Sequence, residues 1–196
     1  MSYLATFSGR KFDYFDIKKE SIHIDDIFRA LPRLNRFVGH SSRAYSVGEH
    51  SINCVFMAEA LGYSPREQFL VFMHDFVEVY MCDCPSPLKN LLPDFVKIEE
   101  QVEAVIYEYF NIEPPTQEEK AKIKKVDWTM LVIEMRDLTM HEHESFINDN
   151  THVEILEKSK ITQPQQMVSE EEIRDQLYAV LYYFGIHYGI GKPYNG

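Results

Sequence analysis

Apolar residues recur at helical spacing along most of the chain. Ile52, Val55 and Phe56 follow the i, i+3, i+4 spacing of one helix face, and Gly62 predicts the end of that helix. The same periodicity predicts further helices over about 23–34, 93–110 and 169–190. Strand-like alternation is almost absent outside the first residues, which could form a short hairpin or an extended arm.

Helix starts are marked by capping boxes, in which a Ser or Thr precedes a Glu by three residues. Three such sequences stand out: "SPRE" at 64–67, "TQEE" at 116–119 and "SEEE" at 169–172. The first predicts a helix that runs to about Met81, where "CPSP" at 84–87 forces a break. The second predicts a helix through about Leu138.

Together these elements predict one all-α domain over residues 1–196, a bundle of about six or seven helices. Its motif-bearing core spans about 24–138. A polar segment over about 140–168, with a short helix expected around 152–158, separates this core from the C-terminal helix.

Composition narrows the possible functions. Hydrophobic residues make up 45% of the 196 residues, which is enough for one sizeable core. A net charge of −11 argues against binding to duplex nucleic acid, although a few local cations could still hold a small anionic substrate. No apolar run reaches the roughly 18 residues of a membrane-spanning helix, and the N-terminus lacks a signal-peptide pattern. Three cysteines, Cys54, Cys82 and Cys84, fit a reduced cytoplasmic protein without a disulfide framework, or one in the host cytoplasm if a phage encodes it.

Three titratable residues interrupt one apolar run. His74 and Asp75 lie side by side in "QFLVFMHDFVEVYM", and Glu78 follows one turn later. A lone ionised carboxylate is strongly disfavoured in an apolar interior, and a divalent cation reverses that preference. His50 in "YSVGEHS" and Asp127 in "KKVDWTM" lie in other predicted helices. Such a mixture of nitrogen and oxygen ligands suits zinc, manganese, cobalt or iron.

The order and spacing of these residues resemble those of the HD-domain phosphohydrolases. "SVGEHS" at 46–51 and "HDFVEVYMCDCPSPLK" at 74–89 match the family patterns "SVxEHS" and "HDxxExxxxDxPxPxK", and Asp127 matches the later Asp. The segment "RFVGHSSRAYSVGEHS" at 36–51 is similar to one in the small phage-type deoxynucleoside triphosphohydrolases. The deoxynucleotide 5′-nucleotidases are also similar. The resemblance implies an HD-domain helical bundle.

The resemblance also implies roles for individual residues. The implied metal ligands are His50, His74, Asp75 and Asp127. Glu78 would be the catalytic acid/base, and Asp83 would hold a water or a second metal, or cap the turn. Lys89 would bind a phosphate, and Pro87 would border the base pocket. The implied candidates for the phosphate tail or the sugar are Arg43, Arg36 and His40. For Arg36 and His40, an ordinary packing or surface role stays open.

Spacing bears on Glu78 independently of the family, and it adds two residues that the motifs do not include. Glu78 is four residues beyond His74, which would place both on the same face of a continuous helix. Glu134 and Arg136 follow Asp127 along the same predicted helix. These two residues could orient the ligands from outside, or form an exposed pair.

We therefore expect a metal-dependent phosphohydrolase that acts on deoxynucleotides with zinc, cobalt or manganese. The resemblance favours cleavage of a purine deoxynucleoside triphosphate, such as dATP, into nucleoside and triphosphate. Removal of the 5′-phosphate from a deoxynucleoside monophosphate is the alternative within this class, and a non-catalytic nucleotide-binding module is the alternative outside it. The role of a second divalent ion beside the phosphates stays open. The C-terminal helix has more aromatic residues than one core-facing stripe needs, so we also expect a homo-oligomer.

Overall fold

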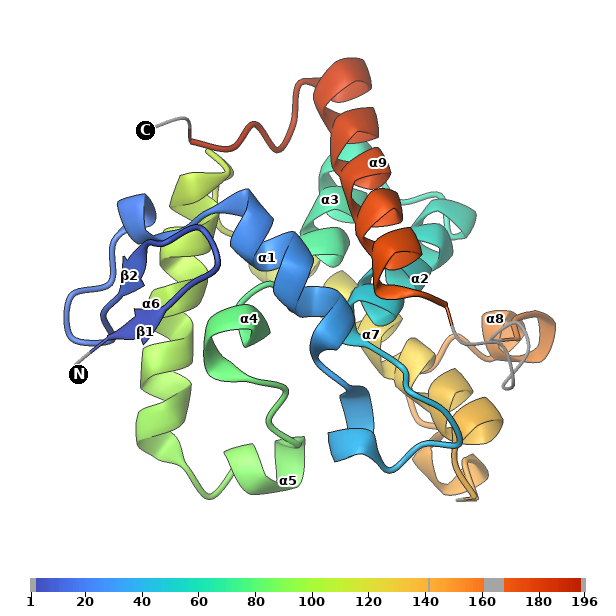
Figure 1. The fold of residues 1–196 in the computed structure, drawn as a ribbon. Helices are drawn as coiled ribbons and strands as arrows, with labels where there is room; N and C mark the ends of the chain where they lie inside the picture. The colour runs from blue at the N-terminus through green and yellow to red at the C-terminus, as the bar shows by residue number, and fades with distance from the viewer. Residues whose placement is uncertain (1–2, 141, 161–167, 195–196) are drawn as a thin grey trace.

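The computed structural model describes residues 3–140, 142–160 and 168–194, and helices dominate it (Figure 1). The longer helices are α1 (Ile24–Ala30), α2 (Val47–Ala60), α3 (Pro65–Met73), α6 (Pro93–Tyr109), α7 (Gln117–Leu138) and α9 (Glu170–Tyr188). The shorter ones are α4 (Glu78–Met81), α5 (Ser86–Lys89) and α8 (Val153–Lys158). Single 3-10 turns lie at η1 (Lys19–Ser21), η2 (Leu31–Arg33), η3 (Arg36–Gly39) and η4 (Glu144–Phe146). The predicted all-α fold is confirmed.

The N-terminal residues form the hairpin rather than the extended arm. β1 (Leu4–Ala5) pairs antiparallel with β2 (Lys11–Phe12). Ser8, in the connecting turn, donates its backbone N–H and its hydroxyl to the Asp26 carboxylate of α1, at 2.6 and 2.7 Å. These hydrogen bonds attach the hairpin to α1.

Local sequence signals set the starts of four helices, because α2, α3, α7 and α9 each begin with a complete capping box. In each box the cap side chain accepts from the backbone N–H three residues on, and the Glu at that position accepts from the backbone N–H of the cap. The caps are Ser46, Ser64, Thr116 and Ser169. The helix starts predicted from the sequence at 64, 116 and 169 are confirmed.

The single helix predicted from Ser64 to about Met81 is wrong, because α3 ends at Met73 and α4 begins at Glu78. Residues 74–77 form a turn in which several backbone hydrogen bonds run from residue i to residue i−3. Hydrophobic periodicity does not reveal this break, because an uninterrupted apolar run is buried in either conformation.

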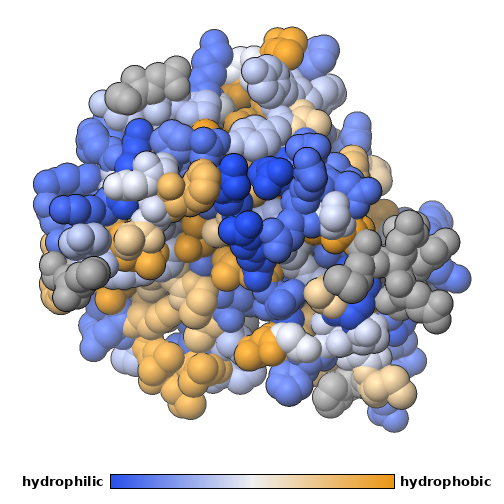
Figure 2. All heavy atoms as spheres, in the orientation of Figure 1, coloured by the Kyte–Doolittle hydropathy of each residue, from blue (hydrophilic) through white to orange (hydrophobic). Residues whose placement is uncertain are grey.

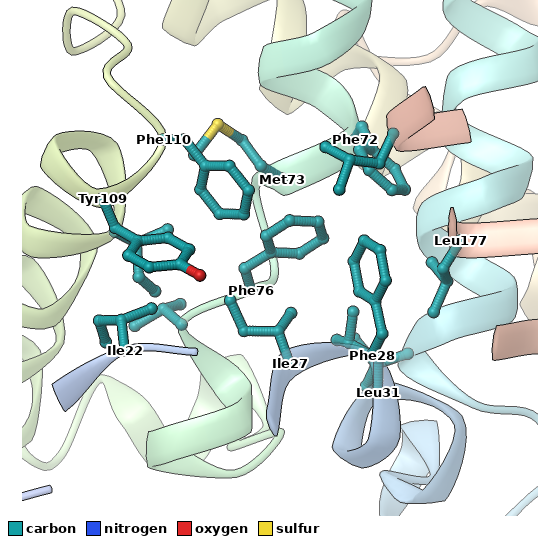
Figure 3. Close-up of a cluster of buried hydrophobic side chains, with 14 of the residues drawn as sticks. Ile22, Ile27, Phe28, Leu31, Phe72, Met73, Phe76, Tyr109, Phe110 and Leu177 are labelled. Atoms are coloured by element: carbon teal, nitrogen blue, oxygen red, sulfur yellow. The ribbon is translucent and has the colours of Figure 1, made fainter. Parts of the chain in front are cut away.

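Phe76 holds this turn against the main hydrophobic core. Figure 3 shows its ring among those of Phe28, Phe72 and Phe110, and the centroids of these rings lie 5.9, 5.0 and 5.8 Å from that of Phe76. His74, two residues earlier, contacts side chains of α2 and α7 instead. The turn therefore has one side packed in the core and a polar side directed at two other helices.

α2 lies beside three of the longer helices. It packs against α3, α7 and α9, and Figure 1 shows these helices beside it. A second, smaller hydrophobic cluster includes Cys54 of α2, Val126 of α7 and Leu156 of α8. The helices that carry the predicted ligands are therefore in direct contact with one another.

The polar segment predicted over about 140–168 contains the short helix α8, as expected. Arg136 of α7 holds this helix by donating to the backbone carbonyls of Leu156 and Ser159, both at 2.6 Å, and it also pairs with Asp137. Arg136 is thus a structural residue. Residues 141 and 161–167 of this segment lie outside the described residues.

Two groups of large apolar side chains are exposed. Leu88, Leu91 and Leu92 belong to α5 and the residues after it, where Figure 2 shows hydrophobic side chains gathered at its lower edge. Phe56 of α2 and Tyr183 of α9 are exposed elsewhere and line a cavity of about 560 Å³. The expected homo-oligomer stays a prediction. In the part of the chain that the structure describes, no helix is both long enough and apolar enough to span a bilayer.

Glu67 joins two helices and should make the stability of the protein depend on pH. Its carboxylate accepts a hydrogen bond from Lys122 of α7 at 2.6 Å and one from the backbone N–H of Ser64 at 2.7 Å. These contacts, with that from Lys122 the strongest, lower the pKa of Glu67 from 4.5 to about 2. Glu67→Gln should lower the free energy of unfolding at pH 7 by about 1 kcal/mol, as measured by urea denaturation.

The effect of Glu67→Gln should depend on pH in one direction. A carboxyl group whose pKa is depressed by folding stabilises the protein above its unfolded-state pKa, and loses that contribution as the pH falls. The difference between wild type and variant should shrink below about pH 4.5 and nearly vanish near pH 2. Glu118 also pairs with Lys122, but its side chain is 79% exposed, so Glu118→Gln is the matched control. The control should cost about 0.3 kcal/mol. Equal effects of Glu67→Gln at pH 7 and pH 3 would contradict this account.

Candidate metal centre

Four of the predicted site residues come together from three parts of the fold. His50 lies in the first turn of α2, His74 caps the end of α3, Asp75 lies in the turn that follows, and Asp127 lies on α7. The His50 side chain is completely buried, whereas that of Asp127 is 41% exposed. The cluster therefore sits in the interior with one side open to solvent, where a substrate could enter.

Their donor atoms converge. Nε2 of His50 lies 3.3 Å from Nε2 of His74, 3.4 Å from Oδ2 of Asp75 and 3.3 Å from Oδ1 of Asp127. Nε2 of His74 lies 3.3 Å from the same Asp75 oxygen and 3.8 Å from the same Asp127 oxygen. Ligand atoms around a tetrahedral metal with bonds of about 2.0–2.2 Å are separated by roughly 3.3–3.6 Å. The spacing of the four atoms matches that of a ligand set.

The hydrogen bonds on the far sides of the two imidazoles set their tautomers. Nδ1 of His50 lies 2.6 Å from Oε1 of Glu134, and Nδ1 of His74 lies 2.6 Å from the carbonyl oxygen of Val71. Both partners are acceptors, so each Nδ1 carries the proton in the neutral ring and each Nε2 keeps its lone pair. Two lone pairs therefore face the same point.

One carboxylate oxygen at that point has no counterpart. Oδ2 of Asp75 is buried and has no hydrogen-bond partner among the described residues. Buried carboxylate oxygens almost always accept a hydrogen bond. Here the two imidazole Nε2 atoms lie 3.4 and 3.3 Å away, and Nη1 of Arg36 lies 3.5 Å away as an ion-pair partner. A divalent cation is the species that fits such a set of donors, and His50, His74, Asp75 and Asp127 are the residues that would hold it.

Glu134 and Arg36 lie directly behind the ligands. Glu134 is completely buried, and its Oε2 accepts from Nε of Arg36 at 2.8 Å. Nη1 of Arg36 lies 3.5 Å from Oδ2 of Asp75. Burial alone would raise the pKa of Glu134, but the positive charge of Arg36 brings it below its usual value. An exposed pair is therefore wrong for Glu134, which is buried and contacts the side chains of His50 and Arg36.

Glu78 and Asp83 place two more carboxylates beside the cluster. Glu78 begins α4 and is buried, and its Oε2 lacks a hydrogen-bond partner within the described part of the chain. Burial raises the pKa of Glu78 well above its usual value, and the neighbouring charges of Asp75 and Asp83 raise it further. Burial likewise raises the pKa of Asp83. Although the helix breaks before Glu78, the charge of Asp75 still acts on this carboxylate.

The remaining predicted residues lie around this centre with partners of their own. Lys89, at the end of α5, donates to Glu99 of α6 at 2.7 Å. Arg43 forms a two-pronged ion pair with Glu49, with contacts of 2.9 and 3.1 Å. His40 and Pro87 are exposed, the first after η3 and the second within α5; no contact of either with the four ligands is among the described interactions.

Cys54 is a member of the surroundings that the sequence did not reveal. Its Sγ lies 3.4 Å from Nε2 of His50, and the thiol and the two imidazoles offer donor atoms within 4.8 Å of one another. Burial raises the pKa of this thiol to about 11. The four-residue spacing from His50 was the available signal, since it places both side chains on one face of α2.

Comparison with known proteins gives the family. No protein-family model matches the chain. YfdR of Escherichia coli K12, an uncharacterised protein, is 41% identical over 143 residues, which make up 72% of this chain and 75% of YfdR. The chain belongs to the YfdR family. An uncharacterised protein of Rhodobacter capsulatus is a more distant relative of this YfdR-family chain, with 28% identity over 110 residues that cover 54% of the chain and 56% of the relative.

Among solved structures, the chain resembles the HD phosphohydrolase DatZ of cyanophage S-2L, determined with dA and one catalytic Zn²⁺ ion. The match covers 84% of this chain and 98% of DatZ, with 18% sequence identity and a TM-score of 0.45. Membership of the YfdR family follows from the sequence relationship.

Proposed function

We propose that this YfdR-family chain is a metal-dependent HD-domain phosphohydrolase that acts on deoxynucleotides. The observation that carries the proposal is the convergence of His50, His74, Asp75 and Asp127. Both Nε2 atoms and a buried carboxylate oxygen that accepts no hydrogen bond among the described residues are directed at one point. The same residues are the ligands that the sequence motifs of that superfamily imply.

The bound cation would supply Lewis-acid chemistry: it would polarise a phosphoryl oxygen and make a nearby water molecule more acidic. The chain's own groups then have to accept a proton and bind the phosphates. A buried carboxylate with a raised pKa is suited to accept a proton near neutral pH, and this favours Glu78 as the general base. The charge of Asp83 acts on Glu78. Asp83 would hold the water molecule or shape the turn that carries Lys89.

Lys89 is the cation we assign to the phosphates. Its ammonium group is held by Glu99, which is 16% exposed, and it feels the charges of Glu78 and Asp75. A polyphosphate entering from the open side would share Lys89 with Glu99. Arg43 would have to leave its ion pair with Glu49 to reach a substrate, so we rank it behind Lys89.

For the substrate, we propose a purine deoxynucleoside triphosphate such as dATP, hydrolysed to deoxynucleoside and triphosphate. The support is the "RFVGHSSRAYSVGEHS" segment at 36–51, which ends on His50. The test is to incubate purified protein with dATP or dAMP and zinc, cobalt or manganese, and to identify the products. Triphosphate supports the proposal, and inorganic phosphate from dAMP points to a 5′-nucleotidase. If the metal-loaded protein binds nucleotides but hydrolyses none, it is a non-catalytic module.

Lys89→Met is expected to weaken substrate binding more than turnover. Loss of one charge-assisted contact to a phosphate should raise KM by about tenfold and change kcat by less than about threefold, as measured in steady-state kinetics. Lys97→Met is the matched control, because Lys97 lies on the neighbouring helix α6 and pairs with the exposed Asp94. If Lys89→Met instead lowers kcat at constant KM, Lys89 does not act in ground-state binding of the phosphates.

A further inference from the structure

A buried ion pair touches two of the four metal ligands from behind. Glu134 contacts His50 through one carboxylate oxygen, at 2.6 Å, and Arg36 through the other, at 2.8 Å. Arg36 in turn points Nη1 at Asp75, 3.5 Å away. A continuous chain of contacts therefore runs from one ligand, through the ion pair, to a second ligand that lies in the turn after α3.

Each member of the pair does something that the other cannot. Glu134 holds the Nδ1 proton of His50, which keeps the Nε2 lone pair directed at the metal position. Glu134 alone would also bring an uncompensated negative charge into a completely buried place. Arg36 cancels that charge, and its planar group leaves a second N–H direction free for Asp75.

The backbone directly after Arg36 is strained, which supports a functional requirement for the position of Arg36. Phe37 and Val38 follow it with φ angles of 57° and 52°, in the left-handed region that bulky and β-branched residues rarely adopt. Such strain persists only where the surrounding structure holds it in place. Here the loop is held at both ends, since the N–H of Arg36 donates to the Tyr45 carbonyl and that of Ser42 to the Leu138 carbonyl.

We propose that Arg36 and Glu134 form a positioning pair, which orients His50 and Asp75 for metal binding, and that Arg36 does not bind substrate. The proposal rests on the metal site described under the proposed function. It reassigns Arg36, which the family resemblance implied for the phosphate tail or the sugar. The side chain of Arg36 is only 10% exposed and its guanidinium is already engaged on two sides, so little of it can face a substrate.

The experiment measures metal binding without turnover. Cobalt(II) is titrated into the metal-free wild type and into Arg36→Met, Glu134→Gln and the double variant, and both the Kd and the visible spectrum, which reports ligand geometry, are recorded. Each single variant should bind cobalt about 10- to 100-fold more weakly than wild type, which is the loss typical when a residue that contacts a metal ligand is removed. The visible spectrum of bound cobalt should also change. The double variant should bind more tightly than the product of the two single losses predicts, because neither charge is left unpaired.

The matched control is a different ion pair, which joins α3 to α7 and does not include Arg36 or Glu134. Arg66 donates to Glu119 at 2.7 Å, close to the start of both helices and away from the ligands. Arg66→Met should leave the cobalt Kd within about twofold of wild type. Far-UV circular dichroism checks the folding of every variant. If Arg36→Met does not fold, Arg36→Lys replaces it: Lys keeps the charge but loses the fork, and weaker cobalt binding with a changed spectrum is again expected.

Two results would overturn the positioning role. One is an Arg36 variant with an unchanged cobalt Kd and spectrum but a raised KM, which would make Arg36 a substrate-binding residue. The other is strictly multiplicative losses in the double variant, which would show that the two residues act separately. Failure of the proposed function can be distinguished from failure of the positioning role. In that case wild type hydrolyses no nucleotide, but cobalt binding still changes across the variants as expected.

Discussion

The Asp75→Ala variant is expected to lose divalent-metal binding by at least about 100-fold, and to lose hydrolysis with it. Residues that only contact a metal ligand are worth about 10- to 100-fold in affinity, so removal of a ligand should cost no less. Oδ2 of Asp75 lies 3.4 and 3.3 Å from the Nε2 atoms of the two histidines, so its removal takes away one of the converging donor atoms. Calorimetric titration with zinc gives the affinity.

Thermal unfolding should separate this effect from damage to the fold. A metal bound at 1,000 times its Kd stabilises the folded state by about 4 kcal/mol, which is about 10 °C in Tm for a chain of this size. Zinc should raise the Tm of wild type by about that amount, and chelator should reverse it. Zinc should leave the Tm of Asp75→Ala nearly unchanged. Without metal the variant should be at least as stable as wild type, because Asp75 no longer repels the neighbouring carboxylates.

Asp94→Ala is the matched control for this experiment. Asp94 lies on the exposed first turn of α6 and pairs only with Lys97 among the interactions described for it. Its zinc response should equal that of wild type. Full zinc occupancy in Asp75→Ala would remove Asp75 from the ligand set and would overturn the geometry on which the proposed function stands.

Glu78→Gln should abolish most turnover while metal binding survives. Gln has the shape of Glu but accepts no proton, so loss of a general base should lower kcat by about 100- to 10,000-fold. The zinc Kd should stay within about tenfold, since Glu78 is not among the four converging ligands. Single-turnover assays with dATP, run beside a zinc titration, measure both quantities on one preparation.

The stability of Glu78→Gln provides an independent check. The Glu78 carboxylate is buried with an unpartnered oxygen and close negative neighbours, so replacing it with a neutral group should not lower the Tm. Glu100→Gln, on the exposed side of α6, serves as the control for a surface carboxylate. Unchanged turnover in Glu78→Gln would exclude this residue from proton transfer.

Local signals predicted most of the helices and their starts. Ser64, Thr116 and Ser169 were recognisable as caps because the capping box is a contact between residues only three apart. The all-α class followed from hydrophobic periodicity for the same reason. The break after Met73 was not predictable in this way, because Phe76 is placed by packing against helices that are distant in sequence.

The partners of the charged residues were the part that sequence could not supply. Arg36 was assigned to substrate from its motif, yet its partner, Glu134, is 98 residues away. The same holds on a smaller scale for Lys89, whose partner Glu99 comes from the next helix. A sequence motif shows which residues belong to a site. Whether one of these residues contacts the substrate or a metal ligand depends on distances that only the fold determines.

The capping boxes have a consequence for how this chain can change in evolution. Three of the proposed ligands lie at a fixed number of residues after a helix cap: His50 after Ser46, His74 after Ser64 and Asp127 after Thr116. One inserted residue between cap and ligand would rotate the ligand by about 100° around the helix axis. Insertions and deletions should therefore be excluded from these three intervals in descendants that keep the metal centre. The connection between α6 and α7, which lies outside all of them, is free to vary in length.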